Sequence, residues 1–170
     1  MKISLPYGSS DYKFNLPTDD YIVDILNPRQ PSVTGPGSDG KVEMALSSPL
    51  GSVKLLNTVT RNTRVAITIN DKTRPVPNAV LLKPLISKLN LLGVPDANIT
   101  LFIASGTHVP MEPEEYKLIL PDELLSRFSI VPHDCDEESN LYAVGITSRG
   151  TQVSVNRKFF DHDLKIVVGD

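Results

Sequence analysis

The chain has 170 residues, 40% hydrophobic and 22% charged, with a formal net charge of −3 at pH 7. These values are typical of one globular domain with a sizeable core, and the slight acidity argues against a nucleic-acid partner. No apolar run reaches the about 18 residues of a membrane span, and the N-terminus lacks the apolar segment of a signal peptide. The single cysteine, Cys135, fits a reducing compartment, so we expect a cytoplasmic protein without a membrane partner.

The first third of the chain predicts short strands and irregular connections. Residues 2–5 and 12–16 flank the Gly8-Ser9-Ser10 turn and predict a hairpin. Four further segments follow. An apolar run predicts a strand at Tyr21–Leu26, recurrent proline and glycine predict an unstructured surface connection at 28–40, and helical patterns lie near Lys41–Leu46 and Ser52–Val59. We interpret residues 1–60 as a β-rich extension packed on the core.

From Arg64 onward the pattern alternates strands with helices. Further elements are expected as strands at 64–70, 99–104, 128–131 and 164–168, helices at 78–92, 112–119 and 121–127, and a hairpin at 141–146 and 151–155. A strand–helix–strand order predicts parallel pairing with a right-handed crossover. Residues 61–170 therefore predict an α/β core with a Rossmann-like, mostly parallel sheet flanked by helices.

The boundaries of the first core helix and the end of the chain allow finer predictions. Asn78 is a plausible N-cap and Gly93 a terminator, while Pro84 predicts either a kink or a later helix start.

The last predicted strand is followed by only Gly169 and Asp170. We therefore expect a C-terminal truncation, with residues 1–170 forming one structural domain of a longer, two-domain enzyme.

Polar residues follow three of the predicted parallel strands. They are Asp71 to Arg74, Gly106 to His108, and His133 with Asp134. Ligands bind at the carboxyl ends of the strands in open α/β sheets, so these segments are expected to meet at one edge. Arg74 can grip a carboxylate or a phosphate through two hydrogen bonds, and a histidine such as His108 suits acid/base chemistry near neutral pH.

The remaining polar residues give weaker indications of a functional site. His108, His133, Asp134 and Cys135 lack a recognised metal-ligand spacing, so no metal ligand is assigned. His133 and Asp134 could equally support the site or cap a turn. We interpret His162 as a surface histidine, Cys135 as inert, and the acidic residues Glu112, Glu114 and Glu115 as a first helical turn that favours the helix dipole.

The motifs DKTRPVP, SGTHVP, VPHDC and TSRGTQVSVNR, in this order, resemble the N-terminal part of the nickel-pincer lactate racemase family. The resemblance covers the chain from about Lys41 and is strongest at Asp71–Pro77 and Gly106–Pro110. It implies that Asp71, Lys72, Thr73 and Arg74 lie against a nickel-pincer nucleotide. It also implies that Arg74 lies near the substrate carboxylate and that His108 is one of two catalytic histidines.

The resemblance further implies a reaction and its partners. The family interconverts the two hands of a 2-hydroxy acid by moving a hydride to and from the cofactor through a 2-keto acid. It implies cofactor-synthesis proteins and the missing C-terminal part of the chain as partners. The family's second catalytic histidine, its cofactor-tethering lysine and its nickel-ligand histidine all come after Asp170, so the fragment alone is expected to be inactive.

The residues by themselves leave two other functions open. A non-catalytic α/β module could use the same segments to bind a phosphate or carboxylate ligand. A metal-assisted hydrolase could use His108 and His133. The 2-hydroxy acid itself cannot be identified from these residues.

Overall fold

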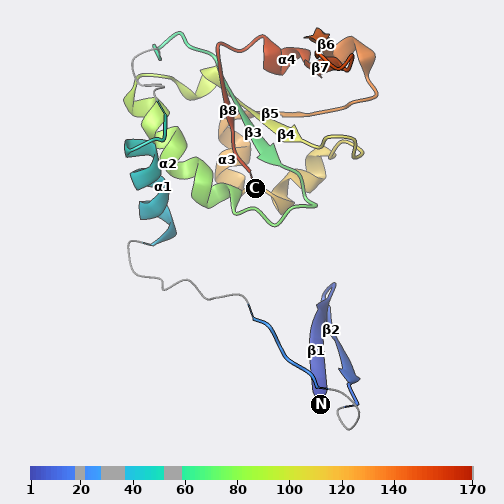
Figure 1. Ribbon diagram of the computed structural model, residues 1–170. Helices are drawn as coiled ribbons and strands as arrows, with labels where there is room; N and C mark the ends of the chain where they lie inside the picture. The colour runs from blue at the N-terminus through green and yellow to red at the C-terminus, as the bar shows by residue number, and fades with distance from the viewer. Residues whose placement is uncertain (18–21, 28–36, 52–58, 170) are drawn as a thin grey trace. The chain divides into compact units, whose positions relative to one another are not determined.

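The computed structural model describes residues 1–17, 22–27, 37–51 and 59–169 (Figure 1). The chain divides into two compact units, Met1–Thr34 and Gly35–Asp170. The expected division into a 1–60 extension and a 61–170 core stays a prediction.

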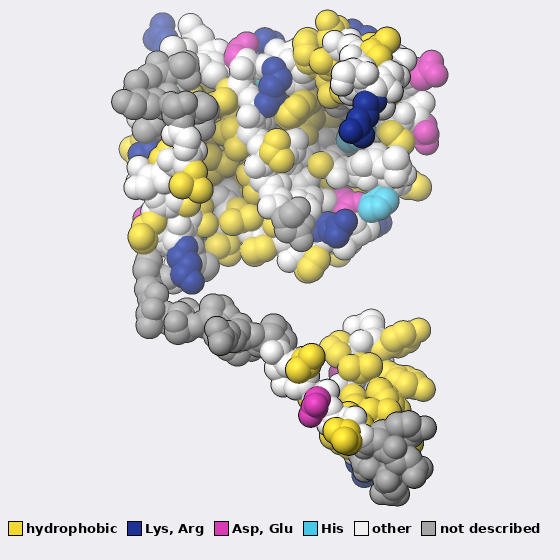
Figure 2. All heavy atoms as spheres, viewed as in Figure 1, with side chains coloured by type: hydrophobic (Ala, Val, Ile, Leu, Met, Phe, Trp, Pro, Cys, Tyr) yellow, Lys and Arg dark blue, Asp and Glu magenta, His cyan; other side chains and the backbone are white. Residues whose placement is uncertain are grey.

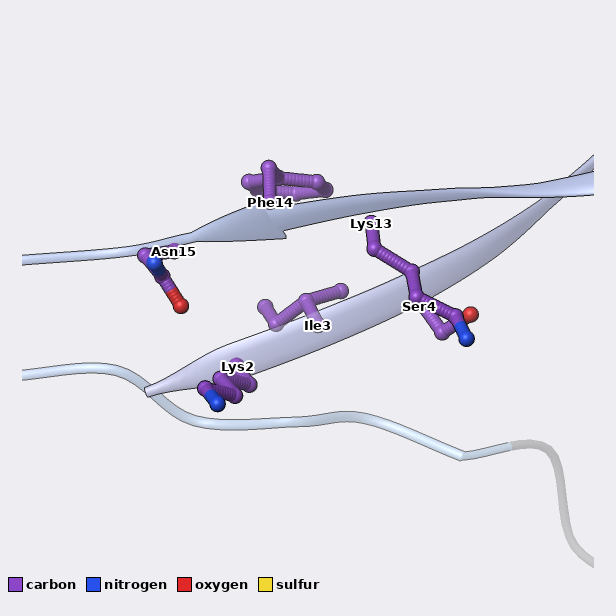
Figure 3. A pocket seen from close by; sticks show the side chains of 6 residues that line it. All are labelled: Lys2, Ile3, Ser4, Lys13, Phe14 and Asn15. Carbon is purple, nitrogen blue, oxygen red and sulfur yellow. The ribbon is translucent and has the colours of Figure 1, made fainter.

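The first unit contains an antiparallel hairpin of β1 (Lys2–Tyr7) and β2 (Ser10–Asn15), as predicted. Ile3 pairs with Phe14 and Leu5 with Tyr12, so these apolar side chains share one face of the hairpin. An open pocket of about 310 Å³ lies against the hairpin (Figure 3). Six residues line this pocket: Lys2, Ile3, Ser4, Lys13, Phe14 and Asn15.

Two predictions in the first third of the chain are wrong, and one lies outside the described residues. Residues 22–27 form no strand, and Ile22 and Leu26 are 97% and 92% exposed. An apolar run alone does not make a strand, because a strand needs a neighbour to pair with. Helix α1 (Ser38–Ser47) begins within the segment predicted to be unstructured, although its central part agrees with the helical pattern. The helix predicted near residues 52–59 lies almost entirely outside the described ranges.

The second unit is built on a four-stranded parallel sheet with the order β5-β4-β3-β8. Its strands are β3 (Val65–Asn70), β4 (Ile99–Ala104), β5 (Ser129–Pro132) and β8 (Leu164–Val167). All four agree with the predicted strands to within one residue at each end. The predicted α/β class with a parallel sheet flanked by helices is therefore confirmed.

The hydrophobic core lies between one face of the sheet and the helices α2 (Asn78–Leu91) and α3 (Asp122–Arg127) (Figure 1). Ile67 and Leu101 come from the sheet, Leu82 from α2 and Leu124 from α3, and each is at most 1% exposed. Alternate strand residues point to opposite faces, so the period-2 pattern of β3 and β4 directs these side chains to the helices.

The structure of helix α2 shows that the predicted N-cap is wrong and that the helix does not begin at Pro84. The helix runs through Pro84, and Asn78 is its first residue rather than its cap. The Asn78 side chain is buried and donates a hydrogen bond to the Ile119 carbonyl oxygen at 3.3 Å. Gly93 ends the helix as predicted, with φ of +92°, a conformation that glycine adopts at low cost.

The opposite face of the sheet packs against α4 (Arg157–Phe160). The Phe102 ring lies edge-on to Phe159 and to His162, with ring centroids 5.5 Å and 5.4 Å away. His162 is half-buried, and its Nε2 lies 3.2 Å from Thr100 Oγ1. The prediction of a surface histidine is wrong, because the ring fills space beside Phe102.

The remaining elements connect the layers. They are the 3-10 helices η2 (Asp96–Asn98), η3 (Pro113–Leu118) and η4 (Glu138–Asn140), and the predicted hairpin of β6 (Leu141–Ile146) and β7 (Gln152–Asn156). The predicted helix at 112–119 is thus a 3-10 helix. Among the described residues, no helix combines the length and apolar character needed to cross a bilayer.

The packing of the core predicts that two leucines of α2 contribute very differently to the stability of the fold. Leu82 is fully buried and Leu91 is 84% exposed. We expect Leu82→Ala to lower the free energy of unfolding by about 2–5 kcal/mol, because it leaves a cavity between α2 and the sheet. Leu91→Ala, the matched control, should change it by less than about 0.5 kcal/mol. Urea denaturation measures both, and equal losses would contradict this account of the core.

Candidate functional site

The candidate site lies where β3 and β4 end. The parallel register places Asn70 opposite Ala104, so the loops that begin at Asp71 and Ser105 run side by side. Figure 2 shows acidic, basic and histidine side chains close together on the surface of this unit. An open pocket of about 460 Å³ is lined here by Asn70, Asp71, Thr73 and Arg74 from the first loop, and by Ala104, Ser105, Gly106, Thr107 and His108 from the second.

Asp71 connects the two loops. Its side chain is buried, and Oδ1 accepts hydrogen bonds from the Thr73 backbone N–H at 3.0 Å and from the Thr73 hydroxyl at 2.6 Å. Oδ2 lies 2.7 Å from His108 Nδ1. Burial raises the pKa of Asp71, but the hydrogen bonds from His108 and Thr73 outweigh it and leave the pKa below its ordinary value. Asp71 is therefore a carboxylate at neutral pH.

His108 is held by this carboxylate at one ring nitrogen. With Asp71 ionised, we assign the proton to Nδ1, so that Nδ1–H donates to Oδ2 and Nε2 keeps a lone pair. The side chain is 54% exposed, and Nε2 has no hydrogen-bond partner among the residues that the structure describes. This arrangement orients the imidazole and leaves one nitrogen able to take a proton.

The backbone of the second loop depends on Gly106. The His108 N–H donates to the Ser105 carbonyl oxygen at 3.0 Å and closes a four-residue turn. Gly106, the second residue of this turn, has φ of +61°, a conformation that other residues rarely adopt. The glycine thus permits the sharp turn that brings His108 back toward Asp71.

Arg74 lies on a rigid part of the first loop. Its backbone N–H donates to the Asp71 carbonyl oxygen at 3.2 Å, and its own carbonyl accepts from Val76 at 2.8 Å. Pro75 and Pro77 restrict the chain that follows. The side chain is exposed, and in the described ranges its guanidinium has no ion pair. A planar cation of this kind can bind an anion through two hydrogen bonds.

Lys72 differs from its neighbours in the first loop. Its ammonium group pairs with the carboxylate of Glu115, which belongs to η3. It is absent from the residues that line the pocket. The structure thus brings Asp71, Thr73, Arg74 and His108 together and directs Lys72 to another partner.

The third strand end lies outside the pocket. The His133 backbone N–H donates to the Ile103 carbonyl oxygen at 3.0 Å, which places it beside the end of β4, but its side chain does not line the pocket. Asp134 Oδ1 accepts from the Asp136 backbone N–H at 2.9 Å, as expected of a turn residue. Burial and the neighbouring Asp136 raise the pKa of the Cys135 thiol, which favours the unreactive form.

Sequence reasoning missed several residues of the site. Asn70, Ala104 and Ser105 line the pocket only because they end a strand or directly follow one, and that position was the available signal. Within the described ranges, no group of three or more His, Cys, Asp and Glu side chains could hold a metal ion.

Comparisons with known proteins point to one family. Residues 7–170 match the family described as the lactate racemase N-terminal domain. The chain is 28% identical to a lactate racemase of Thermoanaerobacterium thermosaccharolyticum over 168 residues and 26% identical to one of Lactiplantibacillus plantarum over 167 residues. Each alignment covers 98% of this chain and 39% of the relative.

A solved structure supports the same relationship. The lactate racemase apoprotein from Thermoanaerobacterium thermosaccharolyticum matches with a TM-score of 0.81 and 26% identity, over 98% of this chain and 38% of that chain. The present chain therefore spans about two fifths of the length of these relatives. The family match, which covers nearly all of the chain, shows that this protein belongs to the lactate racemase N-terminal domain family.

Proposed function

We propose that this chain is the N-terminal part of a lactate racemase-like enzyme that interconverts the stereoisomers of a 2-hydroxy acid. The observation that carries the proposal is the contact between Asp71 Oδ2 and His108 Nδ1 at 2.7 Å, in a pocket that Arg74 also lines. The site thus combines an oriented acid/base group with an anion-binding cation. Both relatives are named lactate racemase, which supports the same reaction.

Arg74 is the proposed binding residue for the substrate carboxylate. Its guanidinium can donate two parallel hydrogen bonds to the two carboxylate oxygens, which sets the direction of the substrate as well as its position. Pro75 restricts the backbone next to Arg74, which limits how far the point of attachment of the Arg74 side chain can move.

His108 is the proposed acid/base group for the substrate hydroxyl. Nε2 accepts the hydroxyl proton as the alcohol becomes a ketone, and Asp71 stabilises the imidazolium that results. The same nitrogen returns the proton when the ketone becomes an alcohol. Since Asp71 is ionised and already bonded to Nδ1, the ring does not need to reorient between these steps.

The α-hydrogen needs an acceptor that these residues do not supply, and the family resemblance implies a nickel-pincer nucleotide. Such a group, when bound, supplies an acceptor for hydride. The pocket suits a nucleotide, because Thr107 and Arg74 line it with hydroxyl and guanidinium donors for phosphate and ribose oxygens, while the Thr73 hydroxyl, which donates to Asp71, can still accept a hydrogen bond. Both oxygens of Asp71 are engaged by Thr73 and His108, so we infer that Asp71 acts on the cofactor through these two side chains.

Further parts of the enzyme belong to the same proposal. The second catalytic histidine, the tethering lysine and the nickel-ligand histidine would come from chain beyond Asp170. Cofactor-synthesis proteins as partners and a cytoplasmic location also stay predictions. Contact between Lys72 and the cofactor stays a prediction as well, since the Lys72 ammonium pairs with Glu115.

The main alternative is a module that binds an anion without catalysis. The unpaired guanidinium of Arg74, in the described part of the chain, favours anion binding under either reading. The two readings differ in what they require of His108.

Replacing His108 separates these readings. In the complete protein we expect His108→Ala to slow racemisation by about 10²- to 10⁴-fold while substrate binding changes little, because the lost group acts on the proton. Arg74→Ala should instead weaken substrate binding. Activity and binding would be measured side by side, with His162→Gln as the histidine control outside the pocket. A near-normal rate in the His108 variant would contradict the acid/base role of His108. A complete protein that binds the anion but shows no racemisation would favour the binding module.

The ionisation of Asp71 predicts a dependence of stability on acid. Its pKa in the folded chain lies below the ordinary 3.8, so its stabilising contribution is complete above about pH 4. That contribution is lost as the pH falls through the folded pKa. We expect Asp71→Asn to reduce stability at neutral pH and to flatten its decline below pH 4, as measured by urea denaturation at several pH values.

A second carboxylate, Asp163, also contributes to the acid dependence measured in this experiment. The hydrogen bonds from Arg64 lower the pKa of Asp163 to about 2, so Asp163 also titrates in strong acid. Some acid dependence will therefore remain in the Asp71 variant. A decline as steep as that of the original protein would contradict the assignment of a low pKa to Asp71.

The dependence on the rest of the enzyme can be tested directly. We expect residues 1–170 with added nickel-pincer nucleotide to show no racemisation of lactate, while the complete protein is active under the same conditions. The physical reason is the lack of a second acid/base group on the opposite face of the substrate. Chiral chromatography measures the two isomers, and measurable conversion by residues 1–170 would overturn this part of the proposal.

A further inference from the structure

The ion pair of Lys72 with Glu115 joins the first site loop to a segment that follows the second. Lys72 lies directly after Asp71, and Glu115 lies in η3, seven residues after His108. Their side chains are 42% and 32% exposed. Asp71 with His108 thus connects the two loops at the pocket, and Lys72 with Glu115, which do not line the pocket, connects the first loop to η3.

Glu115 stands on a well-anchored part of the chain. Its Oε2 accepts a hydrogen bond from the Glu112 backbone N–H at 3.1 Å, while Oε1 contacts Lys72. Met111 and Leu120, on either side of η3, are each only 3% exposed and belong to the hydrophobic core. Glu115 therefore offers a fixed point to which a loop can be attached.

The same segment holds the other end of the loop. Asn78 donates a hydrogen bond to the Ile119 carbonyl oxygen at 3.3 Å, just after η3. Between Lys72 and Asn78 the loop is stiffened by two prolines and carries the exposed Arg74. Its two attachments to the η3 segment thus lie on either side of Arg74.

We propose that Lys72 is a positioning residue whose ion pair with Glu115 holds the 71–77 loop so that Arg74 faces the pocket. The consequence for substrate binding rests on the function proposed above, whereas the effect on the loop does not. An exposed ion pair contributes little to the stability of a whole domain. Its effect is expected in the local order of the short loop that it attaches.

Charge reversal tests this role in the complete protein by amide hydrogen exchange. Lys72→Glu and Glu115→Lys should each speed exchange of the Arg74 and Val76 amides by about two- to fivefold, because each places two like charges together. The double variant Lys72→Glu/Glu115→Lys should restore slow exchange, since the pair reforms with its charges swapped. Lys83 provides the matched control, because it also pairs with a glutamate, Glu123, at 3.8 Å, and Lys83→Glu should leave these amides unchanged.

A second readout separates positioning from direct contact with a ligand. With lactate as the substrate, the single reversals should raise KM more than they lower kcat, and the double variant should recover most of the loss. If Lys72 instead contacts the cofactor, Lys72→Glu would lower the nickel content of the purified protein and the double variant would not restore it. That result, or unchanged exchange in both single variants, would overturn the proposal. Altered exchange in a complete protein that racemises neither lactate nor other 2-hydroxy acids would support the ion pair and overturn the proposed function alone.

Discussion

The buried carboxylate of Asp71 is the interaction on which the site depends. Burial disfavours its charge, and three hydrogen bonds from Thr73 and His108 more than compensate. These partners come from two loops that meet only because β3 and β4 are parallel and in register at Asn70 and Ala104. A one-residue slip between the strands would turn their side chains to the opposite faces and separate Asp71 from His108. The geometry of the site therefore depends directly on the register of the sheet.

The core could be predicted from the sequence because its signals are local. Alternating apolar residues in 65–69, the glycine at 93 and the proline-bounded helices each indicate their structure without knowledge of distant partners. The run at 22–26 has the same apolar character but forms no strand, since pairing depends on a neighbour that the run itself does not specify. The position of β8 beside β3, about a hundred residues earlier in the chain, was likewise beyond local patterns.

The candidate site was predictable in its location but not in its contacts. Topology explains why residues after β3 and β4 share an edge, so Asp71, Arg74 and His108 could be named together. Which of their atoms meet depends on loop conformation, on the φ of Gly106 and on the turn from Asp71 to Thr73. Glu115 shows the same limit: its acidic character indicated a helix start, whereas its partner Lys72 lies 43 residues away.

The three charged side chains of the first loop point in different directions, and these directions determine which charged groups face the pocket. Asp71 is turned inward to Thr73 and His108, and Lys72 is turned away to Glu115. Arg74 is the loop's remaining charged side chain, and it lines the pocket. Had Asp71 paired with Arg74, the loop would present little charge, and a carboxylate would gain nothing by leaving water. Because the Asp71 carboxylate is hydrogen-bonded by Thr73 and His108 instead, the pocket combines the Arg74 guanidinium, which has no ion pair among the described residues, with an imidazole nitrogen. This combination suits an anion that also carries an exchangeable proton.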